Sequence, residues 1–497
     1  MNRVSLLVSA LFLFVLACSR PIARPERTLN VATPPSIWKS GATSAESIST
    51  EWWDYLSDQG LDRAIRRALT YNHDLRAAAA RVAAAEAEII IAHADGRPSL
   101  QAAIGRTRQK QNFVGFPIPG FEGQVLSRTF TSAGASLDAS WEPDLWGRIK
   151  ASKLAAKATF EAREADVAAA RLSLSGQVAK AWFAAIEAQR QVELSKASLA
   201  NYRTSVAHVR SRFESGLRPL LDLRLALTEV DRAGALVSQR LEQQRRAIRQ
   251  LEILLGQYPS GQLTFGKDLP SVPTHVPAGL PAELAYRRPD LASAERELLA
   301  ADARIIVSKA ELRPRFPLTA SGGTASDALR NLLDRNFSAW NFLASFAQPI
   351  FNRGRLKAMV RRDEAIAREA MARYEGVILI AYGEVESALA ADGALAHRMD
   401  ALTSAAHQSM LAKEEAEHRY RVGLTDIITV LSAQRAALDS ESQLFNVHRL
   451  RLDNRVDLHL ALGGGFQATR GSVRDPKVLS RPVLDDQTSR GDEVKAL

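Results

Sequence analysis

Cysteine is nearly missing from this chain, since Cys18 is the only one in 497 residues. No disulfide can therefore form within one chain. Long hydrophobic runs are also scarce, and the clearest one covers only the eleven residues from Leu6 to Leu16. A membrane-spanning helix needs about 20 apolar residues, so this run is too short to be one.

Motifs of catalysis are missing as well. The nine histidines are scattered, and neither a His-Glu-x-x-His pair nor a phosphate-binding loop ending in Lys-Ser/Thr occurs. The sequence therefore predicts no enzyme, no cofactor and no metal site.

The amino terminus has the pattern of an export signal. Arg3 precedes the apolar run, and small Ala17 stands directly before Cys18. We expect residues 1–17 to be a signal peptide that is removed, and Cys18 to be lipidated, so that residues 18–53 form a lipid-anchored segment. A plain signal peptide with an incidental cysteine is the alternative.

The chain is basic, with 65 Lys and Arg against 55 Asp and Glu, a net charge of +10. A basic chain can bind nucleic acid. Here the basic residues are interspersed with acids along helical stretches, as on solvated helix faces, and the signal exports the chain. We therefore expect no nucleic-acid partner.

Two copies of one unit make up most of the chain. The segment that begins at Asp74-Leu75 returns 216 residues later at Asp290-Leu291, and Gly147-Arg148 returns 207 residues later at Gly354-Arg355. The second spacing is shorter than the first because the first copy carries an additional loop rich in Gly, Pro and Phe, from Phe113 to Phe121. The repeat predicts copies over 54–260 and 281–465, joined by a linker over 261–280.

Proline is absent between Pro143 and Pro219 and between Pro349 and Pro476. These gaps are rich in Ala and charged residues, which favour helices. We expect long helices at about 147–214, 219–256, 353–421 and 425–462. A helix of about 70 residues is on the order of 100 Å long, so these helices must pack as coiled-coil hairpins, which turn at Gly216 and Gly423.

Short segments between the helices alternate between apolar and polar residues. In 129–141, Ala133, Leu137 and Trp141 alternate with Ser136 and Asp138. Strands are expected at about 101–113, 129–141, 315–325 and 337–349, with one face suited to hydrocarbon. A half-buried soluble sheet gives the same pattern. If the strands lie in lipid, four are too few to close a barrel, so several chains must share one.

Six short motifs occur in the order found in the TolC-like outer membrane efflux proteins, and the chain resembles the lipoprotein branch that serves resistance-nodulation-division pumps. The resemblance covers roughly 54–465. The motifs are Trp141-Glu142-Pro143-Asp144-Leu145-Trp146-Gly147-Arg148, Leu221-Asp222-Leu223-Arg224, Gly279-Leu280-Pro281 with Arg288-Pro289-Asp290-Leu291, Gln348-Pro349-Ile350-Phe351, Tyr420-Arg421-Val422-Gly423-Leu424 and Leu462-Gly463-Gly464-Gly465.

The resemblance implies a mainly α fold with a small membrane β part. Three chains would share a twelve-stranded β-barrel, four strands from each, that continues into a periplasmic α-helical tunnel. The partners implied are two further copies, a periplasmic adaptor, an inner-membrane resistance-nodulation-division pump and outer-membrane lipid. The chain would be a passive exit duct in the outer membrane of a Gram-negative bacterium.

The family also implies roles for residues near the two helix turns. The expected adaptor contacts are Arg212, Phe213, Gly216, Leu217, Arg419, Tyr420, Gly423 and Leu424. Capping of the helices by glycine is the alternative explanation.

A periplasmic gate is expected just inside these turns. The aspartate usual in the family is replaced by Ser432, a second acidic position by Thr429, and Ile428 stands at an apolar constriction. We therefore expect closure by packing rather than by a carboxylate ring. Asp222 and Asp426 remain nearby, where each can instead stabilise a helix amino terminus.

Two competing functions remain open at this stage. One is a lipid-anchored coiled-coil scaffold without a pore, and the other is an exit duct for protein secretion. The loop 113–121 is expected to lie at the outer mouth, and the polar tail 466–497 to pack loosely.

Overall fold

The computed structural model describes residues 22, 23, 25, 37–40, 49, 51–113, 125–266, 268–273 and 284–466. The signal segment, Cys18, residues 114–121 of the glycine-rich loop, the Gly279-Leu280-Pro281 motif and the tail from residue 467 lie outside this part. Among the described residues, no helix is both long and apolar enough to cross a membrane.

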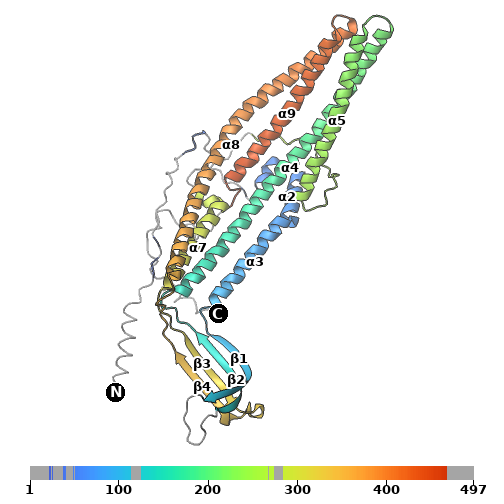
Figure 1. Ribbon diagram of the computed structural model, residues 1–497. Helices are drawn as coiled ribbons and strands as arrows, with labels where there is room; N and C mark the ends of the chain where they lie inside the picture. The colour runs from blue at the N-terminus through green and yellow to red at the C-terminus, as the bar shows by residue number, and fades with distance from the viewer. Residues whose placement is uncertain are drawn as a thin grey trace, which may run out of the picture. The chain divides into compact units, whose positions relative to one another are not determined.

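The elements follow each other in the same order in both copies (Figure 1). The first copy contains η1 (Trp52–Leu56), α2 (Gln59–Tyr71), α3 (His73–Ala94), β1 (Ser99–Phe113), β2 (Leu126–Trp141), α4 (Arg148–Glu214) and α5 (Leu220–Leu254). The second contains α6 (Leu284–Arg287), α7 (Pro289–Ala310), β3 (Leu318–Ser326), η3 (Leu329–Asn331), η4 (Arg335–Phe337), β4 (Ser338–Ala344), α8 (Arg355–Val422) and α9 (Ile427–Ala461). Each copy thus has a helical part, two strands, a very long helix and a shorter returning helix.

The chain divides into two compact units, each of which draws on both copies. The sheet unit comprises 83–161 and 296–372, with the four strands and the adjoining helix ends. The helical unit comprises the described residues within 28–82, 162–295 and 373–466, with most of the long helices.

The sheet unit is built on one antiparallel sheet with the strand order β1-β2-β3-β4. The register places Leu100 opposite Ala139, Ala139 opposite Ala320, and Ala320 opposite Phe342. Because neighbouring partners point to the same side of a sheet, this row lies on one face. The outer strands β1 and β4 each have a free edge in the single chain.

The two faces of the sheet differ in polarity, and we call the first the apolar face. Its large residues are exposed in the single chain, among them Leu100 at 66%, Ile104 at 75% and Trp340 at 84%. The opposite, polar face carries Asp138, whose neighbour Ser136 on the same face donates a hydrogen bond to it at 2.9 Å. Large apolar side chains left exposed on one face indicate a surface that something else covers.

The helical unit has three buried apolar clusters. One gathers η1, α2 and the middle of α4 around Trp52, Leu61 and Phe183. Another lies near the turns between the long helices, around Val209 and Ile427. The third encloses Trp38 with residues of α6, α8 and α9. Residues 37–40 are held further because the Glu386 carboxylate accepts hydrogen bonds from the backbone nitrogens of Lys39 and Ser40.

Candidate functional site

The turns after α4 and α8 end their helices in the same way. At the first turn the amide of Leu217 donates to the Arg212 carbonyl at 2.9 Å, and the amide of Gly216 donates to the Phe213 carbonyl at 2.9 Å. Gly216 has φ +74°, a backbone conformation that glycine adopts without strain. This pair of hydrogen bonds is the usual Schellman ending of a helix.

The second turn repeats the arrangement 207 residues later. The amide of Leu424 donates to the Arg419 carbonyl at 2.9 Å, the amide of Gly423 donates to the Tyr420 carbonyl at 3.1 Å, and Gly423 has φ +85°. Glycine capping therefore accounts for the presence of Gly216 and Gly423 whatever else the turns do.

Two arginines of the first turn tie it to the second. The Arg212 guanidinium donates to the Arg421 carbonyl at 2.7 Å, and the Arg218 guanidinium donates to the Thr425 carbonyl at 3.2 Å. Both guanidinium groups also lie over the ring of Tyr420, at 4.8 and 5.8 Å from its centre. Nothing in the local sequence pattern around Arg218 indicates a partner 207 residues away, so this link is visible only in the structure.

Tyr420, one of the expected adaptor contacts, is buried in the single chain. Its side chain is 3% exposed and belongs to the apolar cluster near the turns, and this burial raises its pKa. Phe213 is half-buried against the same cluster. Tyr420 therefore packs inside the two turns of the single chain, and its contact with an adaptor stays a prediction.

Other expected contact residues are accessible. Leu217 is 73% exposed and Leu424 is 77% exposed, so each turn displays a leucine at the same position of the repeat. Arg419 is exposed and forms an ion pair with Glu415 at 2.6 Å. The two leucines give each turn an accessible apolar side chain at the equivalent position.

The expected gate residues occupy one side of the first turns of α9. Ile428, Thr429 and Ser432 are exposed, whereas Ile427, Val430 and Leu431 are buried. The spacing of three and four residues places the exposed set on one helix face. Ile428 is 53% exposed, and its counterpart in the first copy, Leu221, is exposed as well.

Asp426 caps α9. Its carboxylate accepts hydrogen bonds from the backbone nitrogen and from the hydroxyl of Thr429, both at 2.8 Å, and these bonds lower its pKa. Asp222 lies in the first turn of α5 and is half-buried. The position of each acid agrees with stabilisation of a helix amino terminus.

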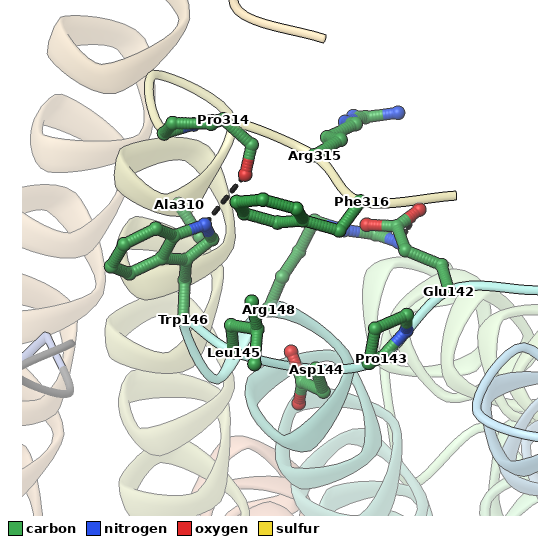
Figure 2. Close-up of a pocket in the computed structure, with 10 residues that line it drawn as sticks. All are labelled: Glu142, Pro143, Asp144, Leu145, Trp146, Arg148, Ala310, Pro314, Arg315 and Phe316. Atoms are coloured by element: carbon green, nitrogen blue, oxygen red, sulfur yellow. Dashed lines mark hydrogen bonds and ion pairs between the residues drawn. The ribbon is translucent and has the colours of Figure 1, made fainter. Parts of the chain in front are cut away.

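A second structured region lies where β2 gives way to α4 (Figure 2). The Asp144 carboxylate accepts from the backbone nitrogens of Ile149 at 3.1 Å and Lys150 at 2.7 Å, which caps the helix. The Trp146 indole donates to the Pro314 carbonyl at 2.6 Å, and Glu142 pairs with Arg148 at 3.2 Å. The long motif around Trp146 thus holds the strand and the helix in a fixed bend.

Within the described ranges, no group of three or more His, Cys, Asp or Glu side chains could hold a metal ion.

The family profile described as "Outer membrane efflux protein" matches residues 64–257 and 280–464, one match for each copy of the repeat. Among curated proteins, the chain is 31% identical over 475 residues to the pyoverdine export outer membrane protein OpmQ of Pseudomonas putida, covering 92% of this chain and 97% of that one. It is 34% identical over 456 residues to the solvent efflux pump outer membrane protein SrpC of Pseudomonas putida, covering 90% and 95%.

Among solved structures, the chain is similar to the outer-membrane channel OprN, with a TM-score of 0.81 and 28% identity over 90% of this chain and 99% of that one. This likeness agrees with the expected fold class, long helices with a small sheet.

Proposed function

Because this chain belongs to the family of outer membrane efflux proteins and is an outer membrane efflux channel, we propose that it is the passive exit duct of a tripartite multidrug pump. Three copies form the channel. A periplasmic adaptor and an inner-membrane pump of the resistance-nodulation-division class deliver drugs and other small molecules to it. The family is one of channels rather than enzymes, and the energy for transport comes from the pump.

The observation that carries this proposal is the sheet with one apolar, exposed face and two free edges. Unpaired backbone groups at a sheet edge are not tolerated in lipid, because each costs several kcal/mol. In a trimer, β1 of one copy pairs with β4 of the next, which removes every edge and closes twelve strands into a barrel. The apolar face then meets lipid and the polar face meets water.

The ends of the chain complete the assignment. Residues 1–17 direct export and are removed, and lipid on Cys18 anchors the segment 18–53 to the membrane. We divide the rest of the chain into two repeats over 54–260 and 281–465, a linker over 261–280 and a polar tail over 466–497. The two stretches matched by the family profile, 64–257 and 280–464, support the two repeats.

The turns after α4 and α8 are the adaptor contacts in this proposal. The accessible leucines Leu217 and Leu424 supply apolar contact, and Arg419 supplies charge. The inward side chains of Arg212, Phe213 and Tyr420 keep the two turns together, while Gly216 and Gly423 set their shape.

The gate lies on the exposed face of α9. Symmetry brings one Ile428 from each copy to the channel axis, so three side chains form an apolar constriction, and Thr429 and Ser432 add hydroxyl groups. Asp426 keeps its carboxylate on its own helix, and Asp222 remains near the other turn without forming a ring.

Deletion of the gene tests the function. The deletion strain should become sensitive to a panel of antibiotics and dyes, and plasmid-borne wild-type chain should restore resistance, whereas a variant lacking residues 99–141 should not. Loss of secreted proteins without any change in drug sensitivity would indicate a secretion duct instead.

Reconstitution in planar bilayers separates a channel from a scaffold. The purified lipoprotein should migrate as a trimer and conduct ions after insertion. A trimer that never conducts would indicate a coiled-coil scaffold without a pore.

A further inference from the structure

The outer half of β1 carries three basic residues at alternate positions, Arg106, Arg108 and Lys110. Alternate residues of a strand share a face and lie about 6.7 Å apart. All three side chains are exposed, and within the part of the chain that the structure describes none of them forms a hydrogen bond or an ion pair.

These three residues share the apolar face with Leu100 and Ile104, because all five have even positions in one strand. Across the sheet, Arg106 lies opposite Ala133, and Lys110 opposite Thr129. Along β1 the apolar face therefore changes from hydrocarbon side chains to positively charged ones. This change indicates the boundary between the membrane interior and the headgroup region.

The basic end of β1 is the one farther along the sequence from α3 and α4. β1 begins at Ser99, shortly after α3, and β2 ends at Trp141, shortly before α4, so Leu100 belongs to the helix-proximal end. A tilted strand needs about 9–11 residues to cross the hydrocarbon. Counted from Ser99, Arg108 and Lys110 are the tenth and twelfth residues of β1, at the level of the outer headgroups, and Arg106, the eighth, lies just inside that level.

The sheet itself offers these charges no counter-charge. The four strands contain one acidic residue, Asp138, which pairs with Gln101 and Ser321 in the register and so lies on the polar face. Neighbouring copies bring strands of the same sequence and add no acid to the apolar face. No acid of the strands therefore balances the three charges on the apolar face.

The connection between β3 and β4 adds a second feature to the same face. The hydroxyl groups of Thr324 and Ser326, on the apolar face, donate to the carbonyls of Leu332 and Ala328 at 2.7 Å, which ties this connection to that face. It exposes Leu333 and two arginines. The arginines are Arg330 and Arg335. Its acids are Asp327 and Asp334, and Asp334 accepts the amide of Asn336 as the cap of η4. Exposed apolar and basic side chains together are typical of a membrane interface.

We propose that Arg106, Arg108 and Lys110 bind the phosphate groups of outer-leaflet lipid, of the kind carried by a phosphorylated glycolipid such as lipopolysaccharide. This inference rests on the proposed function, because only a membrane-inserted sheet turns that face to lipid. The guanidinium group presents paired N–H donors to phosphate oxygens, and the long side chains reach from the strand to the headgroup level. Each trimer then carries three such sites around its outer rim.

The test compares lipid binding by the full-length lipoprotein and two variants. The first variant is R106Q/R108Q/K110Q. The matched control is Arg128→Gln, which removes an exposed arginine from the polar face of the neighbouring strand, where it lies over the Phe130 ring. Trimers in phosphatidylcholine nanodiscs are titrated with purified lipopolysaccharide, and bound lipid is counted by native mass spectrometry.

Each basic residue near an anionic surface contributes about a fivefold gain in binding, so the triple variant should bind roughly 100-fold more weakly, and Arg128→Gln should bind like wild type. Equal binding by the triple variant, or an equal loss in Arg128→Gln, would overturn the proposal. So would displacement of the lipid by inorganic phosphate alone, because that would identify a site for free phosphate. Bilayer conductance of the same samples reports on the proposed function separately, and the triple variant should conduct normally.

Discussion

Arg288 and Glu384 form an ion pair of 2.6 Å that joins the start of α7 to the middle of α8. The same guanidinium pairs with Asp290 at 2.7 Å and donates to the Ala461 carbonyl at 3.0 Å, at the end of α9. One side chain of the Arg288-Pro289-Asp290-Leu291 motif therefore links three helices of the helical unit. Nearby, Gly463 has φ +89°, and a Cβ at this position would overlap the Arg287 carbonyl oxygen.

Replacement of Arg288 should destabilise the helical unit more than replacement of its partner. The Arg288 side chain is 8% exposed, whereas Glu384 is 48% exposed. Arg288→Met leaves the Ala461 carbonyl and two carboxylates without their donor, which should lower the free energy of unfolding by about 2–3 kcal/mol. Glu384→Gln removes a half-exposed charge, worth less than about 1 kcal/mol. Thermal unfolding of the detergent-solubilised trimer, followed by circular dichroism, should show a larger fall in Tm for Arg288→Met.

The exposed pair of Arg246 with Glu242 provides a control, and Arg246→Met should leave Tm within a degree or so. An equal fall in all three variants would contradict this account.

Sequence patterns located the strands but not their ends, for reasons that lie in particular residues. A strand was expected over 315–325, but β3 begins at Leu318, because Pro314 and Pro317 lack the backbone donor that a ladder needs. The strand expected over 337–349 ends as β4 at Ala344. Beyond it only an isolated bridge joins Arg315 to Ala347, and Pro349 follows.

At the helix turns, the sequence predicts the local geometry but not the contacts between distant residues. Gly216 and Gly423 were identified from local pattern, because a helix that ends in a left-handed residue needs glycine there. The burial of Tyr420 and the link from Arg218 to Thr425 were not, because both depend on how the two hairpins pack against each other. Local periodicity carries no information about contacts between residues 207 positions apart.

The apolar gate should control the resting conductance of the channel. Ile428→Ala shortens the side chain that lines the proposed constriction, so single channels in planar bilayers should conduct several-fold more without any adaptor. Leu221→Ala, at the corresponding position of the first copy, is the matched control and should leave the resting conductance near that of wild type. A wider resting pore in Leu221→Ala alone would place the constriction on α5.

Divalent cations should block this channel weakly. The only acid at the start of α9, Asp426, already accepts two hydrogen bonds from Thr429, and Ser432 and Thr429 carry no charge. Asp426→Asn should therefore leave the response to Mg²⁺ and Ca²⁺ unchanged, and it should change stability little, because asparagine caps a helix about as well as aspartate does. A strong block in wild type that vanishes in Asp426→Asn would show that the carboxylates do form a ring.

The exposed leucines of the two turns should matter for pump assembly rather than for folding. Leu217→Asp combined with Leu424→Asp places charge where apolar contact with an adaptor is proposed. Resistance of the complemented deletion strain should fall by about the same factor as in the deletion itself, with normal trimer yield and bilayer conductance. Tyr258, which is 86% exposed in the segment after α5, offers a control, and Tyr258→Asp should restore resistance fully. Restoration by the double variant would remove the turns from the adaptor contact.

His459 should make the helical unit sensitive to acid. It is 5% exposed between the rings of Trp52 and Tyr55, and burial together with the positive charge of Arg455 lowers its pKa to about 4. The unfolded chain, with a histidine pKa near 6.5, binds the proton more readily than the folded chain does between these two values. The stability contributed by the neutral ring is therefore complete above pH 6.5 and is lost as pH falls toward 4, by about 2 kcal/mol at pH 5. His459→Phe keeps the aromatic packing and removes the titration. Its Tm should match wild type at pH 8 and exceed it by several degrees at pH 5. The control is His448→Phe, at a histidine whose pKa is also lowered by burial but whose ring bonds to the Pro270 carbonyl at 3.1 Å. Because that bond is lost, His448→Phe should lower the Tm at both pH values. Parallel pH profiles of wild type and His459→Phe would show that His459 is not the group that titrates.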